Sequence, residues 1–232
     1  VYTKDEFPEE WAKTQQNMGF AYRHRIKGDQ SENLEMAIQA YQAAFQVFTR
    51  EAFPEYWAQC HINLGEAYRE RIKGNLAQNL ELAIEAYQTA LQVGTFEAFP
   101  ELWASAHNNL GIAYYNRIRG NRQENIEKAV QVLQAALQVR TLEAFPREWA
   151  RLQHNLALAY SERIKGNREE NLEKAITACQ AASQVFTRDA FPYDWAKNQN
   201  NLAIVYTNRG QIDEAVGCCR LALEVFTPTA FP

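Results

Sequence analysis

The segment that decides the fold spans residues 53–98 and reads FPEYWAQCHINLGEAYRERIKGNLAQNLELAIEAYQTALQVGTFEA. In its first half, apolar side chains recur at helical steps, for example at Trp57, Leu64 and Tyr68, which is the pattern of one helix face. Pro54 suits the first turn of this helix, because the N–H that proline lacks would have no partner there. The first half is therefore predicted to be a helix.

The second half of the segment predicts another helix that folds back on the first. Gly74 is expected to end the first helix in a left-handed conformation. Asn75 follows as a helix cap, and Gln78 stands three residues later, as in a capping box. The segment thus predicts two antiparallel helices of about 18–20 residues each, and it shows no strand pattern.

The same segment recurs along the chain at a fixed period. The dipeptide Phe-Pro returns after 46 residues four times and then after 40, and a Trp follows each of the first five. Such a period indicates a solenoid, in which each module buries its apolar face against its neighbours. We therefore expect residues 1–232 to form a single array. Its modules span approximately residues 7–52, 53–98, 99–144, 145–190 and 191–230.

Two further positions repeat in every module. A small residue in each first helix is expected to let the paired helix approach closely; these residues are Gly19, Gly65, Gly111, Ala157 and Ala203. An arginine near the end of each first helix suits the helix dipole and could pair with a glutamate of a second helix. These arginines are Arg25, Arg71, Arg117, Arg163 and Arg209.

The motif Leu64-Gly65-x-x-Tyr68, followed by Ala83 and Tyr87, resembles the tetratricopeptide repeat, TPR. The resemblance extends over all five modules. It implies an all-α fold, a right-handed superhelical solenoid of five antiparallel helix pairs. The period of 46 exceeds the roughly 34 residues of an ordinary TPR, and it also fits HEAT or armadillo repeats, which lack this spacing.

Among TPRs, the segment 200–206, NNLAIVY, resembles the repeats of kinesin light chain. The 46-residue form is similar to arrays that bacterial multidomain proteins place before a caspase-like CHAT peptidase or a signalling NTPase. This resemblance implies a recognition or regulatory arm. Because both ends of the sequence read like the interior of a module, we expect a segment of a longer protein.

Composition argues against several other classes. The net charge of −4, without a basic block, disfavours nucleic-acid binding. No apolar run reaches the roughly 18 residues of a membrane span, and no signal peptide is visible. No metal-binding, cofactor-binding or catalytic constellation is spaced for its chemistry, so we expect no cofactor and no enzyme activity. We expect a cytoplasmic protein whose cysteines are buried free thiols. These are Cys60, Cys179, Cys218 and Cys219.

The strongest candidate binding feature is an asparagine ladder. The residue before the motif Leu or Met is Asn in all five modules: Asn17, Asn63, Asn109, Asn155 and Asn201. The resemblance implies that the first helices line a concave groove. A side-chain amide both donates and accepts, so a ladder of amides could hold the backbone of an extended peptide. Alternatively, each Asn bonds the neighbouring helix and supports the packing of modules.

Other side chains are expected to line the same groove and to make it slightly basic and partly apolar. They are Phe20, Arg23, Ile62, Arg69, Ile112, Tyr115, Arg151, Leu158 and Lys197. The sequence therefore predicts a protein-interaction module that binds an extended peptide with acidic and apolar side chains. The alternatives are a structural spacer that associates end to end, and an inactive part of an enzyme whose catalytic domain lies elsewhere.

Overall fold

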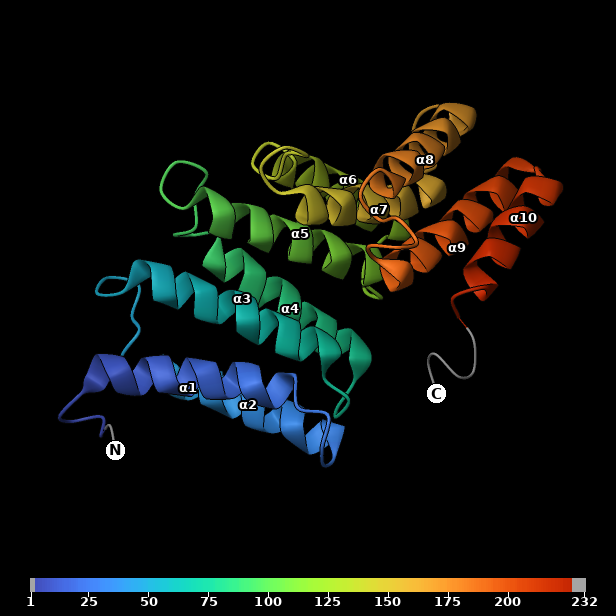
Figure 1. The fold of residues 1–232 in the computed structure, drawn as a ribbon. Coiled ribbons are helices and arrows are strands. Elements are labelled where there is room, and N and C mark those ends of the chain that lie inside the picture. Colours follow the sequence, from blue (N-terminus) through green and yellow to red (C-terminus); the bar gives the residue numbers. More distant parts are fainter. Residues whose placement is uncertain (1–2, 227–232) are drawn as a thin grey trace. The chain divides into compact units, whose positions relative to one another are not determined.

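The computed structural model describes residues 3–226, in which helices joined by loops are the regular elements and no strand occurs (Figure 1). The helices are α1 (Pro8–Arg23), α2 (Gln30–Ala44), α3 (Pro54–Glu70), α4 (Leu76–Ala90), α5 (Pro100–Asn116), α6 (Arg122–Ala136), α7 (Pro146–Glu162), α8 (Arg168–Ser183), α9 (Pro192–Arg209) and α10 (Ile212–Leu223). They fall into two compact units, Val1–Gly120 and Asn121–Pro232, which are described separately below as unit 1 and unit 2.

Both units are stacks of helix hairpins. In unit 1, α1 packs on α2 and α3 on α4, while α2 contacts α3 and α4 contacts α5. In unit 2, α7 packs on α8 and α9 on α10, while α6 contacts α7 and α8 contacts α9. The first helices also touch one another, α1 with α3, α3 with α5, and α7 with α9. The predicted all-α fold of packed helix pairs is confirmed. No described helix is both long and apolar enough to cross a bilayer.

The Phe-Pro dipeptide starts each first helix in the same way. At α3, Pro54 is the first helical residue and Phe53 caps the helix through its backbone rather than its side chain. The Phe53 N–H donates to the Thr49 carbonyl at 3.0 Å, which turns the chain before the helix begins. The Phe53 ring lies edge-on against Phe48, and Tyr56 stacks on Phe48 from the next turn. Residues that are close in sequence therefore determine both where α3 begins and how its first turn packs against the end of the preceding module.

The hairpin tip differs from the prediction. Gly74 has the expected positive φ of 85°, but α3 ends four residues earlier, at Glu70. The intervening residues form a loop because the buried Asn79 amide of α4 donates to the Arg71 carbonyl at 3.2 Å and to the Lys73 carbonyl at 2.9 Å. The predicted cap on α4 is confirmed, since its cap side chain accepts a bond from the third helical N–H.

Helix lengths also correct the prediction. The helices α3 and α4 have 17 and 15 residues, and both are shorter than predicted. In the shorter fifth module, α9 has 18 residues and α10 has 12. The extra residues of the longer modules therefore lie in the tip loop and the second helix, and they do not extend the first helix.

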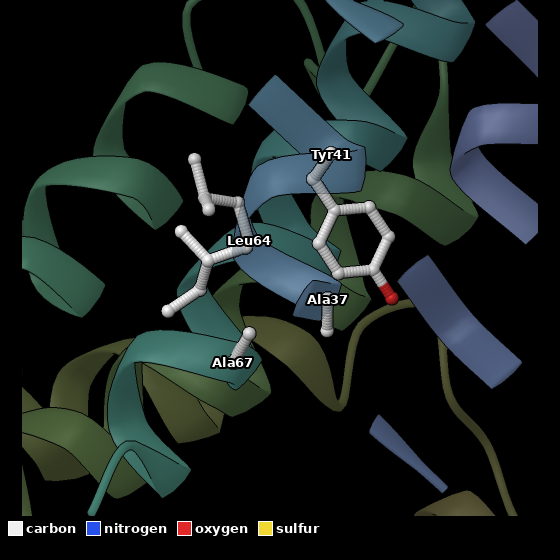
Figure 2. Packing of buried hydrophobic residues seen from close by; sticks show 5 residues of the cluster. Ala37, Tyr41, Leu64 and Ala67 are labelled. Carbon is white, nitrogen blue, oxygen red and sulfur yellow. The ribbon is translucent and has the colours of Figure 1, made fainter. Parts of the chain in front are cut away.

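The small residues of the first helices admit an aromatic ring, as Gly65 shows. A Cβ atom on Gly65 would lie 2.5 Å from the Tyr87 ring, and one on Gly19 would lie 2.6 Å from the Tyr41 ring. Both rings are fully buried. Figure 2 shows the Tyr41 ring close to Leu64. The predicted close approach is confirmed at these two glycines, and its cause is a tyrosine of the second helix.

The repeated arginine joins each module to the one before it. Arg71 donates from Nε and Nη2 to both carboxylate oxygens of Glu35, on α2, at 2.7 and 2.8 Å. This bidentate contact lowers the pKa of the Glu35 carboxyl below its usual value. The predicted pairing with second-helix glutamates is confirmed for four of the five arginines, all except Arg25. The equivalent pairs are Arg117 with Glu81, Arg163 with Glu127, and Arg209 with Glu173.

Candidate functional site

Within each unit, equivalent residues of the first helices lie on one face, which we call the first-helix surface of that unit. Residues at positions −4, 0, +3 and +6 from the ladder asparagine share a face of a helix. In unit 1 this surface carries Lys13, Asn17, Phe20 and Arg23 on α1, Gln59, Asn63, Glu66 and Arg69 on α3, and Ser105, Asn109, Ile112 and Tyr115 on α5. In unit 2 it carries Arg151, Asn155 and Leu158 on α7, and Lys197, Asn201 and Ile204 on α9.

An ionic network occupies the middle of this surface in unit 1. Glu66 accepts a hydrogen bond from the Arg23 guanidinium and another, of 3.0 Å, from the Asn109 amide. Arg23 also donates from Nε to Glu70 at 3.0 Å, and Arg69 donates to the other oxygen of Glu70 at 3.0 Å. The Arg23 side chain is only 10% exposed. The two predicted groove cations of unit 1 are therefore already paired.

The asparagine ladder is not uniform. Asn109 and Asn201 are each only 8% exposed, and both donate to the preceding first helix, to Glu66 and to His154. Asn63 is half-buried and accepts a bond from Gln59 on its own helix at 3.0 Å. At Asn109 and Asn201 the amide thus has the alternative role, a bond to the neighbouring helix. The remaining members, Asn17 and Asn155, are exposed and half-buried respectively.

A buried polar cluster lies below the ladder in unit 2. The Asn198 amide donates to the Cys179 carbonyl at 2.8 Å and to Ser183 Oγ at 2.9 Å, so its carbonyl faces His154 Nδ1 at 3.4 Å. Burial lowers the pKa of His154 to about 4, which keeps the imidazole neutral near pH 7. A neutral imidazole donates from one nitrogen and accepts at the other, so it can serve both Asn198 and Asn201.

The other predicted groove residues divide by exposure. Ile62 is 3% exposed, so its side chain is covered and we leave it out of the binding surface. Phe20 is 53% exposed, and its ring centroid lies 4.3 Å from that of His24. The half-buried members are Ile112, Tyr115 and Leu158. The exposed cations are Arg151 and Lys197.

Unit 2 carries the same chemical order on two adjacent first helices. Along α7 and along α9, a cation is followed after four residues by the ladder asparagine and after three more by an apolar residue. Among residues 3–226, neither Arg151 nor Lys197 has a carboxylate partner, and Lys197 lies 5.5 Å from the Tyr193 ring centroid. Ile204 is 44% exposed. This surface therefore offers unpaired cations beside apolar side chains.

A separate hollow of about 490 Å³ lies on unit 2 and is lined by α6, α7 and α8. Its walls include Gln134, Leu137, Leu156, Tyr160, Lys174 and Thr177. None of the predicted groove residues lines it, so it is a competing location for a ligand.

Neither Asn198 nor the pairing of His154 with the ladder was predicted from the sequence. A signal was present, because the residues equivalent to Asn198 in modules two to four are apolar. A single polar residue in an apolar row predicts a buried hydrogen-bonded contact.

The cysteines were predicted to be buried, but Cys219 is exposed, since it lies on the open side of α10. Within residues 3–226, no group of three His, Cys, Asp or Glu side chains is arranged to bind a metal ion.

The buried His61 is expected to make the stability of the fold depend on pH. Burial between the rings of Phe45 and Trp57 lowers the pKa of His61 to about 4. An unfolded histidine, with a pKa of about 6.5, binds a proton as pH falls from 7 to 5, whereas folded His61 does not, so stability falls in this range. The lowered pKa corresponds to roughly 2 kcal/mol between pH 7 and pH 5, and because the ring is partly exposed we expect His61→Gln, which copies Gln15, to reduce the loss by about half of that. Urea unfolding at pH 7 and pH 5 measures it, and an unchanged pH dependence would contradict the assignment.

Comparison with known proteins agrees with this geometry. A family model described as tetratricopeptide repeat matches residues 199–226. The crystal structure of BtubC (BKLC) from P. vanneervenii is similar with a TM-score of 0.61 and 17% sequence identity, over 95% of this chain and 93% of that chain, a likeness that concerns the fold. No curated protein matches. The family-model match and the packed helix pairs fit a TPR array. TPR repeats generally act as protein–protein interaction modules, and their fold is typically non-catalytic.

Proposed function

We propose that the first-helix surface of unit 2 binds an extended peptide segment with acidic and apolar side chains. The observation that carries the proposal is the repeated order of cation, asparagine and apolar residue on α7 and α9. The cations Arg151 and Lys197 would pair with ligand carboxylates, and Leu158 and Ile204 would contact its apolar side chains. Asn155 would bond the peptide backbone, while Asn201 stays on His154.

The spacing of the helices suggests the conformation of the ligand. Packed helices lie about 8–10 Å apart. A polyproline-II segment has three residues per turn and a rise of about 3.1 Å per residue, so every third side chain points the same way at about 9 Å intervals. A ligand that crosses α7 and α9 in this conformation would place acidic residues three positions apart against the two cations.

Taken by itself, the first-helix surface of unit 1 would offer a ligand contacts of another kind. Its cations Arg23 and Arg69 are bound to Glu66 and Glu70, so they add little net charge for a ligand. Phe20 is exposed and could pack against an apolar ligand side chain. The further contacts proposed in unit 1 are Asn17, Asn63, Ile112 and Tyr115.

The test compares the removal of cations from two different places in the full chain. Fluorescent peptides with an acidic-x-x-acidic motif and apolar neighbours are titrated against wild type, Arg151→Ala/Lys197→Ala and Lys174→Ala. We expect the double variant to bind at least about tenfold more weakly, which corresponds to about 1.4 kcal/mol. Wild-type binding should weaken with salt, because exposed pairs are screened.

Lys174→Ala serves as the control because it removes one exposed cation from a second helix. It should leave the affinity unchanged. Binding that is lost in this control and kept in the double variant would place the ligand in the hollow lined by α6, α7 and α8. Equal binding by all three proteins, or no binding by any, would contradict the proposal.

The wider role is also a proposal. A peptide-binding array of this kind would serve as the recognition or regulatory arm of a larger multidomain protein. A structural spacer is the alternative, and it predicts no peptide binding at all.

A further inference from the structure

The outer side of α10 carries an uncovered apolar stripe. Ile212, Val216, Cys219 and Leu223 stand at steps of four, three and four residues, which places them along one side of the helix. Ile212, Val216 and Leu223 are 56%, 43% and 64% exposed, and Cys219 is also exposed. A continuous exposed apolar stripe of this kind indicates an interaction site.

The same molecule contains a covered copy of this stripe. Forty residues earlier on α8 stand Leu172, Ile176, Cys179 and Ser183. The first three are 2%, 4% and 0% exposed. The helix α9 covers this side: Leu202 packs against Cys179, and Asn198 donates to Ser183. The α10 stripe is therefore suited to bind the side of a first helix that packs on a preceding second helix, as α9 packs on α8.

The repeated arginine–glutamate pairs point to a specific occupant. In each pair an arginine at the end of a first helix binds a glutamate of the preceding second helix, as Arg209 binds Glu173 at 2.9 Å. Forty residues after Glu173 stands Asp213, exposed on α10. The first arginine of the series, Arg25, is exposed after α1. Among residues 3–226, neither Arg25 nor Asp213 has an ion-pair partner. Arg25 of one copy and Asp213 of another copy could therefore form the missing pair.

The docking face of α1 is open as well. Met18 occupies the position of Leu64 and Leu156, which are 6% and 3% exposed in the interior modules. Met18 itself is 38% exposed. On α3, Leu64 is buried against the preceding second helix, α2, whereas Met18 on α1 faces solvent.

We propose that α10 of one copy of this chain binds α1 of a second copy. The contact repeats the α8–α9 interface, with Met18 on the apolar stripe and Arg25 paired with Asp213. The interface is heterologous, because the α10 stripe of one copy meets the α1 face of another. A pair of copies therefore still has one unused α1 face and one unused α10 stripe. Association can therefore continue beyond a dimer into rings or open chains. This proposal is independent of peptide binding by α7 and α9.

Sedimentation velocity of the full 232-residue chain over a concentration series tests the proposal. Wild type should show an average mass that rises with concentration. Val216→Glu places a charge in the stripe and should weaken the association constant at least about tenfold. Arg25→Asp and Asp213→Arg should each weaken it, because like charges then face each other. The double reversal Arg25→Asp/Asp213→Arg should restore it, since the pair re-forms with opposite signs.

Asp189→Arg makes the same chemical change at an exposed loop residue and should leave association unchanged. Circular dichroism and cooperative melting establish that each variant is folded. A wild-type chain that stays monomeric at every concentration would overturn the proposal and assign the stripe to another helix. Association that resists Val216→Glu, or that the double reversal fails to restore, would overturn it equally.

Discussion

Gly65→Ala should destabilise unit 1 by about 2 kcal/mol. The added Cβ atom would lie 2.5 Å from the Tyr87 ring, which is fully buried. Overpacking of this kind costs about 1–3 kcal/mol or more, and it outweighs the gain of up to about 1 kcal/mol from replacing a helical glycine by alanine. Urea unfolding followed by circular dichroism measures the change.

Two comparisons isolate the clash. Gly217→Ala should be neutral or stabilising, because no atom lies within 4 Å of its Cβ position on α10. Module four carries Ala157 where Gly65 stands, and it has Cys179 in place of Tyr87. In a Tyr87→Cys background, Gly65→Ala should therefore cost little or nothing. An equal cost in both backgrounds would mean that the ring is not the cause.

Glu66→Gln should also destabilise unit 1, by about 2 kcal/mol. The carboxylate joins α1 and α5 through Arg23 and Asn109, and the Arg23 side chain is 10% exposed. Removal of one partner of a well-buried pair costs about 3–5 kcal/mol, and the cost is lower here because Glu70 still holds Arg23 and Glu66 is 22% exposed. Thermal and urea unfolding at pH 7 measure the loss.

The control is Glu9→Gln, which breaks the pair between Lys13 and Glu9 on α1. That pair is well exposed, and such contacts contribute about 0.5 kcal/mol or less. A double-mutant cycle with Arg23→Gln should give a coupling energy above about 1 kcal/mol for Arg23 and Glu66. Equal effects of Glu66→Gln and Glu9→Gln would show that the network does not hold the first helices together.

The helix starts could be predicted because the residues that make them are neighbours in sequence. Pro54 and the Asn75 cap act within one turn, and their geometry agrees with the prediction. The predicted end of α3 was wrong because Asn79, on the next helix, donates hydrogen bonds to the loop at the hairpin tip. The pairing of the repeated arginines with second-helix glutamates could be predicted, because both residue types recur along the modules. Which module supplies the glutamate could not be predicted from the sequence.

The candidate site was predicted less completely than the fold. Five asparagines look alike in the sequence, yet Asn109 bonds Glu66 while Asn63 bonds its own helix. Arg23 was predicted to line the groove and make it slightly basic, but Glu66, 43 residues later, neutralises it. Ile62 was expected at the surface and lies in the interior. Each outcome depends on which side chains the neighbouring helix brings within reach.

The sequence by itself determined the module period, the helix-pair architecture and the positions at which helices begin. Those features follow from apolar periodicity and from hydrogen bonds within one turn, which depend on nearby residues. Only the tertiary structure decided which amides and charges are available to a ligand, as Arg151 is and Arg23 is not. That choice depends on partners about 40 or more residues away, which meet only when hydrophobic burial stacks the helices.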